Sequence, residues 1–411
     1  MAKKKAMIVA NDMGYSSIKA DIDGEYVYQP SVVADIKAYQ TPNVESFEDQ
    51  SQATNAYMSG FLEHMDVSIA SSAISMPGRY FVGNAAVGSG IMTSGMDVYA
   101  NTDKSETDMP VFVTLATIAA KAVKDAYEAG EDVFAPITAH VNMTTALPIS
   151  ESKSQEKATA YAHRYTDSTH TITFHNFKDP ITVSLKFDDT YVCQEGSIAH
   201  LVFVNASDDF REGVREELKS NYGDDIEDDV LDSLLNAENT LSIDIGQGTT
   251  DFSVGIEGRM LNSASVSINQ GYGSVLGQAM AALADKRINF STAEKLMNFL
   301  STKPMPWKKQ RYDEIKETVY QQLEPLANEI SKTVNRIAIA GDVNQQIDVI
   351  YVYGGGAVPM GTHSTLRQQL MTVAEKQGLG PVVFVPAKYS QKMNLMGLKM
   401  MAQFRSSQSQ Q

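Results

Sequence analysis

Three segments of this sequence place carboxylates, glycines and hydroxyls where a chain could bind phosphate groups. The first begins at Asp12, which ends an apolar run, and continues through Gly14 and two serines to Lys19. A tight turn whose backbone N–H groups point inward forms a concave anion site. Lysine adds a positive charge for phosphate, and aspartate can hold a water-ligated Mg²⁺ ion. Taken alone, the segment also fits a plain β-hairpin turn.

The second segment begins at Asp244 and lies between two β-rich runs. Gly246 and Gly248 allow the backbone to approach a phosphate closely, because they carry no Cβ. Thr249 and Thr250 supply hydroxyls, and Asp244 supplies a second carboxylate. This combination is more specific than the first and favours a phosphate site over a structural turn.

The third segment is the triple glycine Gly354–Gly356, which follows an apolar strand pattern over residues 347–353. Glycines at a strand end suit close contact with a ligand, but a triple glycine by itself could be only a turn. Its value lies in its position after the other two segments.

The elements that must position these segments alternate between β-rich runs and helical periodicity. The predicted strands cover residues 6–11, 17–22, 25–34, 139–146, 190–204, 241–245, 251–256 and 347–353, with a hairpin over 169–187. The predicted helices cover 111–128, an acidic stretch over 208–236 interrupted at Gly223, 273–287, 291–301 and 311–340. A strand, glycine turn and strand occur twice, near 6–22 and 241–256, which indicates two related lobes.

The composition excludes several classes of protein. The 411 residues suffice for two domains, and the formal net charge of −16 disfavours tight direct binding to DNA. No apolar run reaches the roughly 18 residues that a membrane span needs, and Cys193 is the only cysteine. No Walker A motif, Rossmann spacing or paired-histidine metal spacing is present. We expect a cytoplasmic protein with a buried Cys193, and His170 and His175 on solvent-facing strand positions.

The order of the three segments resembles the superfamily of actin, sugar kinases and heat-shock chaperone ATPases, whose phosphate-1, phosphate-2 and adenosine motifs follow this order. The stretch from Asp12 to Lys19 looks most like the ParM-type plasmid-segregation actins. Residues 194–198 and 390–397 resemble the two connecting segments of these proteins, and Tyr80–Asn84 resembles part of their mobile subdomain.

This resemblance implies an α/β, actin-like (ribonuclease H-like) fold with two lobes, a mixed β-sheet in each lobe and ATP in the interlobe cleft. Lobe I would cover residues 1–205, with a mobile, loosely structured insertion at about 36–110. Lobe II would cover 206–389, and residues 390–411 would return to lobe I and end in a disordered tail.

The resemblance also implies ATP and Mg²⁺ as cofactors. Asp12 and Asp244 would hold the metal through water and take part in catalysis. Glu195 would orient the attacking water. The residues implied in nucleotide binding are Gly14, Tyr15, Ser16, Lys19, Gly246, Gly248, Thr249, Thr250, Gly354, Gly355 and Gly356.

The function that the resemblance implies is an ATPase that polymerises head to tail and segregates plasmid or other replicon DNA. A ParR-like DNA-binding adaptor would be its partner, with no direct contact to DNA or a membrane. Two alternatives stay open. One is a small-molecule kinase of the same superfamily. The other is a membrane-linked division or shape actin of the FtsA or MreB type, for which Met393–Phe404 would form an amphipathic membrane helix rather than a core helix.

Overall fold

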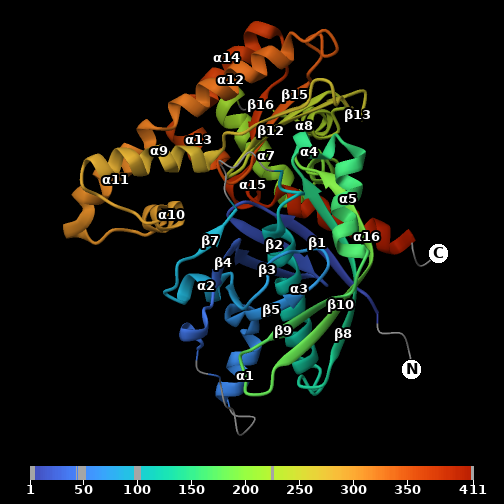
Figure 1. Cartoon of the computed structure of the whole chain (residues 1–411). Coiled ribbons are helices and arrows are strands. Elements are labelled where there is room, and N and C mark those ends of the chain that lie inside the picture. Colours follow the sequence, from blue (N-terminus) through green and yellow to red (C-terminus); the bar gives the residue numbers. More distant parts are fainter. Residues whose placement is uncertain (1–4, 43, 45–51, 97–102, 224–225, 409–411) are drawn as a thin grey trace. The chain divides into compact units, whose positions relative to one another are not determined.

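Two compact units make up the chain in the computed structural model, which describes residues 5–42, 44, 52–96, 103–223 and 226–408 (Figure 1). Unit 1 comprises Met1–Leu147, Glu151–Cys193 and Leu398–Gln411. Unit 2 comprises Pro148–Ser150 and Gln194–Gly397. The sequence predicted that the chain leaves lobe I after residue 205 and returns to it at residue 390. In the structure, the corresponding boundaries between the units follow Cys193 and precede Leu398.

Unit 1 is built on a ten-stranded mixed sheet with the order β3-β2-β1-β8-β10-β9-β5-β6-β4-β7. Strand β1 pairs with β2 antiparallel and with β8 parallel. The strands are β1 (Met7–Met13), β2 (Ser17–Ile22), β3 (Glu25–Pro30), β4 (Val32–Asp35), β5 (Asp66–Ala70), β6 (Tyr80–Val82), β7 (Ser94–Gly95), β8 (Ile137–Leu147), β9 (His170–Phe174) and β10 (Ile181–Gln194).

The centre of unit 1 is helix α3 (Asp108–Glu128), in which every residue from Pro110 to Val123 is buried. A helix that is apolar nearly all round belongs in a core. Strand β1 is tied to it by a hydrogen bond of 3.1 Å from Asn11 Nδ2 to Thr114 Oγ1. The other helices that lie wholly in unit 1 are η1 (Ala38–Gln40), α1 (Gln52–Ser59), η2 (Phe61–His64), α2 (Asn84–Gly88) and α5 (Gln155–Thr166).

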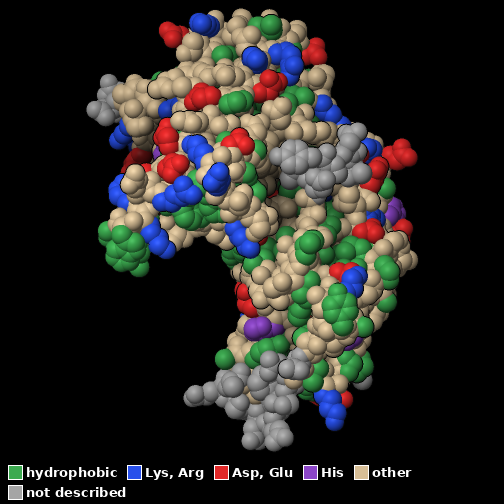
Figure 2. Space-filling view, turned by 60° about the vertical axis from the view of Figure 1, so that its left-hand side comes forward, with side chains coloured by type: hydrophobic (Ala, Val, Ile, Leu, Met, Phe, Trp, Pro, Cys, Tyr) green, Lys and Arg blue, Asp and Glu red, His purple; other side chains and the backbone are tan. Residues whose placement is uncertain are grey.

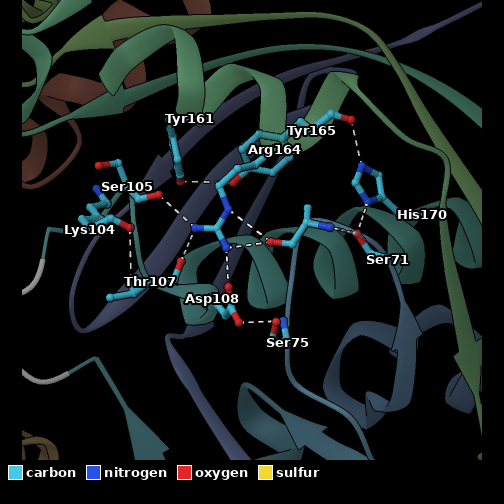
Figure 3. A network of polar contacts seen from close by, with 11 residues as sticks. Ser71, Ser75, Lys104, Ser105, Thr107, Asp108, Tyr161, Arg164, Tyr165 and His170 are labelled. Atoms are coloured by element: carbon cyan, nitrogen blue, oxygen red, sulfur yellow. Dashed lines mark hydrogen bonds and ion pairs between the residues drawn. The ribbon is translucent and has the colours of Figure 1, made fainter. Parts of the chain in front are cut away.

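A polar network fixes two loop segments of unit 1 around Arg164 of α5 (Figure 3). Its guanidinium donates to the backbone carbonyls of Ala73, Ser105 and Thr107. It also pairs with the carboxylate of Asp108 at the start of α3. One side chain therefore fixes the conformation of irregular backbone that the sequence pattern does not specify.

His170 belongs to the same region and is fully buried, so the expectation of a solvent-facing position is wrong for it (Figure 3). Its Nε2 lies 2.8 Å from the Tyr165 carbonyl oxygen, and its Nδ1 lies 2.7 Å from Ser71 Oγ. Because a carbonyl only accepts, Nε2 carries the proton and Nδ1 accepts from the serine. Burial lowers the pKa of His170.

Unit 2 is built on a six-stranded mixed sheet with the order β13-β12-β11-β15-β16, and β14 also pairs with β12. Strand β11 pairs with β12 antiparallel and with β15 parallel, the same arrangement as β2-β1-β8 in unit 1. The strands are β11 (Thr240–Ile245), β12 (Thr250–Ile256), β13 (Arg259–Met260), β14 (Val266–Ile268), β15 (Val349–Tyr353) and β16 (Val382–Phe384).

The helices of unit 2 bury a second apolar core against this sheet, centred on residues such as Ile243, Leu276 and Val352. They are α6 (His200–Val204), α7 (Asp208–Tyr222), α8 (Asp228–Leu235), α9 (Tyr272–Asp285), α10 (Ala293–Ser301), η3 (Pro306–Lys308), α11 (Lys309–Gln321), α12 (Glu324–Ala338), α13 (Ala357–His363), α14 (Leu366–Gln377) and α15 (Ala387–Ser390). Helix α4 (Ile149–Ser152) and helix α16 (Met393–Gln408) each contain residues of both units.

Four predicted elements differ from the structure. Residues 200–204 form helix α6, not the end of a strand, and the predicted helix over 311–340 is two helices that meet at Gln322–Leu323. The predicted strand over 25–34 is interrupted at Ser31. Residues 406–408, expected in a disordered tail, end helix α16, while 409–411 lie outside the described residues. Where it is described, the 36–110 stretch contributes three strands to the main sheet of unit 1, namely β5, β6 and β7.

Helix α16 buries Met393, Leu395 and Leu398, which is the behaviour of a core helix. Cys193 is buried as expected, and burial raises the pKa of its thiol to about 12. Among the described helices, none combines the length and the apolar character that a membrane crossing requires.

Candidate functional site

The first candidate turn, in unit 1, joins β1 to β2. Asp12 stands opposite Lys19 in the strand register, and the Lys19 ammonium lies 2.9 Å from Asp12 Oδ2. The turn closes with a hydrogen bond of 2.9 Å from Gly14 N to Ser17 O. A Cβ on Gly14 would lie 3.0 Å from that carbonyl oxygen, so the close approach favours glycine.

Ser31, directly before β4, holds the turn in place. Its N–H donates to Ser16 O at 3.0 Å, and its hydroxyl donates to Gly14 O at 2.8 Å. The C=O and N–H of a trans peptide point in opposite directions. The peptide between Gly14 and Tyr15 therefore directs its N–H away from Ser31.

The second turn, in unit 2, repeats the first residue for residue. Asp244 stands opposite Asp251, as Asp12 stands opposite Lys19, and Gly246 N donates to Thr249 O at 2.9 Å. A Cβ on Gly246 would lie 3.2 Å from Thr249 O. The duplication inferred from the sequence thus extends to the turn geometry.

The backbone of the second turn has unused donors. Gly248 is buried, yet its amide and that of Gln247 donate to no acceptor in the described part of the chain. A buried N–H without a partner costs free energy, and nearly all such groups are paired with protein, water or ligand. These two amides are what a bound phosphate oxygen would satisfy, so the residues present fit such a group.

The start of helix α9 supports this turn through two backbone hydrogen bonds that the spacing of the motif does not predict. Tyr272 N donates to Gly246 O at 2.9 Å and Gly273 N donates to Gln247 O at 2.8 Å. A Cβ on Gly273 would lie 2.6 Å from Gln247 O, and one on Gly271 would lie 2.6 Å from Gly246 O. The paired glycines around Tyr272 were the available signal.

The triple glycine packs against the end of β11. Gly354 has a φ of +100°, and a Cβ there would lie 2.3 Å from Asp244 Oδ1 and 2.5 Å from Ile245 O. Gly356 N donates to Ile245 O at 2.8 Å. Gly355 differs from its neighbours, because the nearest atom to an added Cβ is Gln391 Cγ at 3.7 Å.

Asn394 at the start of α16 links the remaining pieces of unit 2. Its Nδ2 donates to Asp244 Oδ2 at 2.7 Å, and its Oδ1 accepts from Gly196 N at 3.3 Å. The Tyr353 hydroxyl donates to Gly196 O at 2.5 Å. Glu195 therefore lies on a turn that is anchored at both the N–H and the C=O of the next residue, Gly196. Burial raises the pKa of Tyr353, and the Asp244 charge adds to that effect.

Asp251 accepts hydrogen bonds from Thr249 Oγ1 at 2.8 Å, from Ile149 N at 3.2 Å and from the hydroxyl of Ser267. Across the described residues, no cluster of three or more His, Cys, Asp or Glu side chains could hold a metal ion. Asp12 and Asp244, the two expected metal residues, belong to different units. A metal at either of them would need oxygen ligands from water or from a bound phosphate.

The predicted site residues thus form two groups. Unit 1 brings together Asp12, Gly14, Tyr15, Ser16 and Lys19 on one hairpin. Unit 2 brings together Asp244, the Gly246–Thr250 turn, Gly354–Gly356 and the turn that carries Glu195.

Two family models match successive parts of the chain. The first, described as the N-terminal domain of actin-like proteins, matches residues 10–197. The second, described as the C-terminal part of the archaeal actin homologue MreB-like, matches residues 242–365. The chain belongs to the actin-like superfamily. The matched ranges contain both turns and the triple glycine of this actin-like protein.

Solved structures of other actin-like proteins have the same fold. The actin-like protein Alp7A is 15% identical, with a TM-score of 0.67, over 98% of this chain and 97% of Alp7A. A non-polymerisable quadruple mutant of pCBH ParM is 16% identical, with a TM-score of 0.60, over 97% and 99%. Bacillus thuringiensis ParM with ATP is 14% identical, with a TM-score of 0.56, over 98% and 100%. No curated protein sequence matches the chain.

Proposed function

We propose that this actin-like protein binds and hydrolyses ATP and that hydrolysis controls its assembly into filaments. The observation that carries the proposal is the repeated turn, whose Asp-x-Gly-x-x-Ser/Thr spacing and closing hydrogen bond are the same in both units. The amides of Gln247 and Gly248, which have no acceptor among the described residues, add a place for phosphate oxygens. A solved ParM of the same fold is described with ATP, which supports this ligand class.

Each turn would contribute differently to phosphate binding. In unit 1, Lys19 is close to Asp12, and a polyphosphate would compete with that carboxylate for the ammonium. In unit 2, the amides of Gln247 and Gly248 would donate to phosphate oxygens. Asp12 and Asp244 would hold Mg²⁺ through water, and the bound metal would offset phosphate charge.

Glu195 would orient the attacking water in hydrolysis, as a general base or hydrogen-bond acceptor. Its turn is fixed by Asn394 and Tyr353 through Gly196, and Asn394 also binds Asp244. The carboxylate that would face water is thus positioned by the same side chain that positions a candidate metal residue. Preorganisation of this kind is the main source of rate enhancement in phosphoryl transfer.

The biological role that we propose is segregation of plasmid or other replicon DNA through a basic DNA-bound adaptor. The chain is strongly acidic, with a net charge of −16, so DNA would have to be reached through a partner of opposite charge. Head-to-tail contacts between identical chains form open filaments when the rotation does not close.

The deciding experiment is calorimetry of Mg–ATP binding together with light scattering and electron microscopy. We expect one nucleotide per chain, and filaments that form with ATP and decay as phosphate is released. Asp12→Ala should abolish Mg–ATP binding. The matched control is Asp35→Ala, which removes an exposed partner of Lys37 outside the turn and should bind normally. Unchanged affinity for Mg–ATP in Asp12→Ala would refute the assignment of the unit 1 turn. Intact ATP binding without assembly in the wild type would favour the small-molecule kinase.

A further inference from the structure

The loop between α10 and α11, with the first residues of α11, exposes the only tryptophan of the chain. We call residues 302–311 the Trp307 loop. The Trp307 side chain is 78% exposed and Met305 is 58% exposed. In Figure 2 a hydrophobic cluster protrudes from the surface of the molecule, with Lys and Arg side chains around it. Exposed aromatic and methionine side chains in one place mark an interaction site more often than isolated apolar residues do.

The loop is stiff, so it presents Trp307 at little entropic cost. Pro304 and Pro306 fix two of its φ angles, and Pro306 begins the short helix η3. Lys308 N donates to Met305 O at 2.8 Å, which closes the turn that carries Trp307. A preorganised aromatic side chain loses little freedom on binding and can therefore contribute strongly to affinity.

The loop is also basic on a chain that is acidic overall. Lys303, Lys308, Lys309 and Arg311 lie within it, and it contains no acidic residue. Lys309 pairs with Asp313 and Arg311 with Glu314, but Lys303 and Lys308 form no ion pair within the described ranges. The partner of this loop should be an acidic surface with room for an indole ring.

The same unit carries an acidic surface on helices α7 and α8, which we call the acidic face. These helices contain eight acidic residues and three basic residues, and all three basic residues lie on α7. Arg211 pairs with Asp232, and Arg215 pairs with Glu212 and Asp228. Glu216 and Asp229 are exposed and form no ion pair with the residues that the structure describes. Tyr222 and Val230 of the same two helices are 45% and 42% exposed, so these helices also present apolar surface.

We infer that the Trp307 loop is a self-assembly contact, which docks on the acidic face of a second copy of this chain. The inference rests on the proposed function, because it names the surfaces of the proposed head-to-tail contact. The two surfaces differ, so their contact is heterologous and leaves one loop and one face free at the two ends of any assembly. A chain with a net charge of −16 repels DNA and anionic membranes, whereas its own acidic face is present at the same concentration as the loop.

The test measures the critical concentration for assembly with Mg–ATP by light scattering and sedimentation. Trp307→Ala and Lys303→Glu/Lys308→Glu should each raise it by about tenfold or more. Two controls should assemble like the wild type: Phe404→Ala removes another aromatic side chain, 59% exposed, and Lys332→Glu/Lys376→Glu makes the same charge change elsewhere.

Charge exchange makes the test specific. Glu216→Lys/Asp229→Lys should also fail to assemble alone. An equimolar mixture with Lys303→Glu/Lys308→Glu should assemble as an alternating copolymer, because each contact then joins opposite charges. Recovery in the mixture would not occur if either variant were merely misfolded.

The outcomes separate the two proposals. Failure of the wild type to assemble with any nucleotide would refute the filament function and, with it, this inference. Normal assembly of Trp307→Ala and of the loop charge variant would refute the inference alone. The inference would also fail if assembly were unchanged but binding of duplex DNA, or of vesicles with 30% phosphatidylserine, depended on Trp307.

Discussion

Replacing Gly354 by alanine should disturb both the stability of unit 2 and its candidate phosphate site. The glycine has a φ of +100°, and an added Cβ would lie 2.3 Å from Asp244 Oδ1 and 2.5 Å from Ile245 O. Neither contact is with the flexible end of a long side chain. One is the carboxylate of a candidate metal residue and the other is the backbone of a central strand.

Two effects set the size of the loss. A left-handed φ costs a residue with a Cβ about 1–2 kcal/mol, and overpacking in a well-packed site adds about 1–3 kcal/mol. The free energy of unfolding should therefore fall by about 3 kcal/mol. For a unit of roughly 200 residues, this corresponds to a fall in Tm of about 6–12 °C. Asp244 must also move, so the affinity for Mg–ATP should fall even in the fraction of the variant that is folded.

Gly355→Ala is the matched control, because it makes the same chemical change one residue away. The nearest atom to its added Cβ is Gln391 Cγ at 3.7 Å, an ordinary contact, and its φ is not positive. Its free energy of unfolding should change by less than about 1 kcal/mol. Urea unfolding and calorimetry with Mg–ATP would measure both variants. Equal effects of the two substitutions would refute the argument that the clash with Asp244 makes Gly354 necessary.

Three further predictions follow from the site and from unit 1. Asn394→Leu should lower the free energy of unfolding in urea by about 1–3 kcal/mol, because Asp244 and Gly196 lose a half-buried partner. The control Asp209→Leu, which removes an exposed pair with Lys388, should cost less than about 1 kcal/mol, and equal losses would contradict the bridging role of Asn394. Glu195→Ala should keep ATP binding and filaments but slow phosphate release at saturating ATP by about 10²–10⁴-fold, and a normal turnover rate would remove Glu195 from catalysis. The pKa of His170 is lowered by burial, so its stabilising contribution should be complete above about pH 6.5 and be lost as pH falls below that value. Between pH 7.5 and pH 5.5, the free energy of unfolding should fall less for His170→Gln, which keeps a donor for the Tyr165 carbonyl, than for the wild type. An equal fall in both proteins would assign the acid sensitivity to the other histidines.

Local pattern was sufficient for the elements that surround the two turns. The prediction for β2, Ser17–Ile22, has the observed bounds, and β11, β12 and β15 each differ by no more than two residues at either end. These strands are short, apolar and bounded by glycine turns, which are strong local signals. The repeat of strand, turn and strand could be recognised in the sequence for the same reason.

The errors arose where tertiary contacts override local preference. Residues 200–204 are rich in β-forming side chains, yet they form a helix in which Phe203 stacks on Tyr351 with ring centroids 3.7 Å apart. The division between α11 and α12 was missed because apolar periodicity continues across it. Pro325 was the available signal, since proline fits the first turn of a helix but not its interior.

Within the site, the sequence identified residues but not the contacts that hold them. Asp244 and Asn394 are 150 positions apart, and no local pattern indicates that their side chains meet. The support from Gly271 and Gly273 was missed because each is needed only for its approach to the carbonyls of the second turn. Spacing indicates which residues can bind phosphate, whereas packing decides which other residues must stay small.

The difference between the two turns is as informative as their likeness. At the position opposite the strand-end aspartate, unit 1 has Lys19 and unit 2 has Asp251. Like charges directly opposite each other on a sheet are destabilising. Unit 2 offsets this cost with the hydroxyls of Thr249 and Ser267, which donate to Asp251, and with the amide of Asn394, which donates to Asp244. Residues that break a local rule and require such compensation are expected at functional sites. The repeated turn therefore carries a carboxylate opposite an ammonium in unit 1 and two opposed carboxylates in unit 2, and these are the charges that the proposed phosphate and metal roles require.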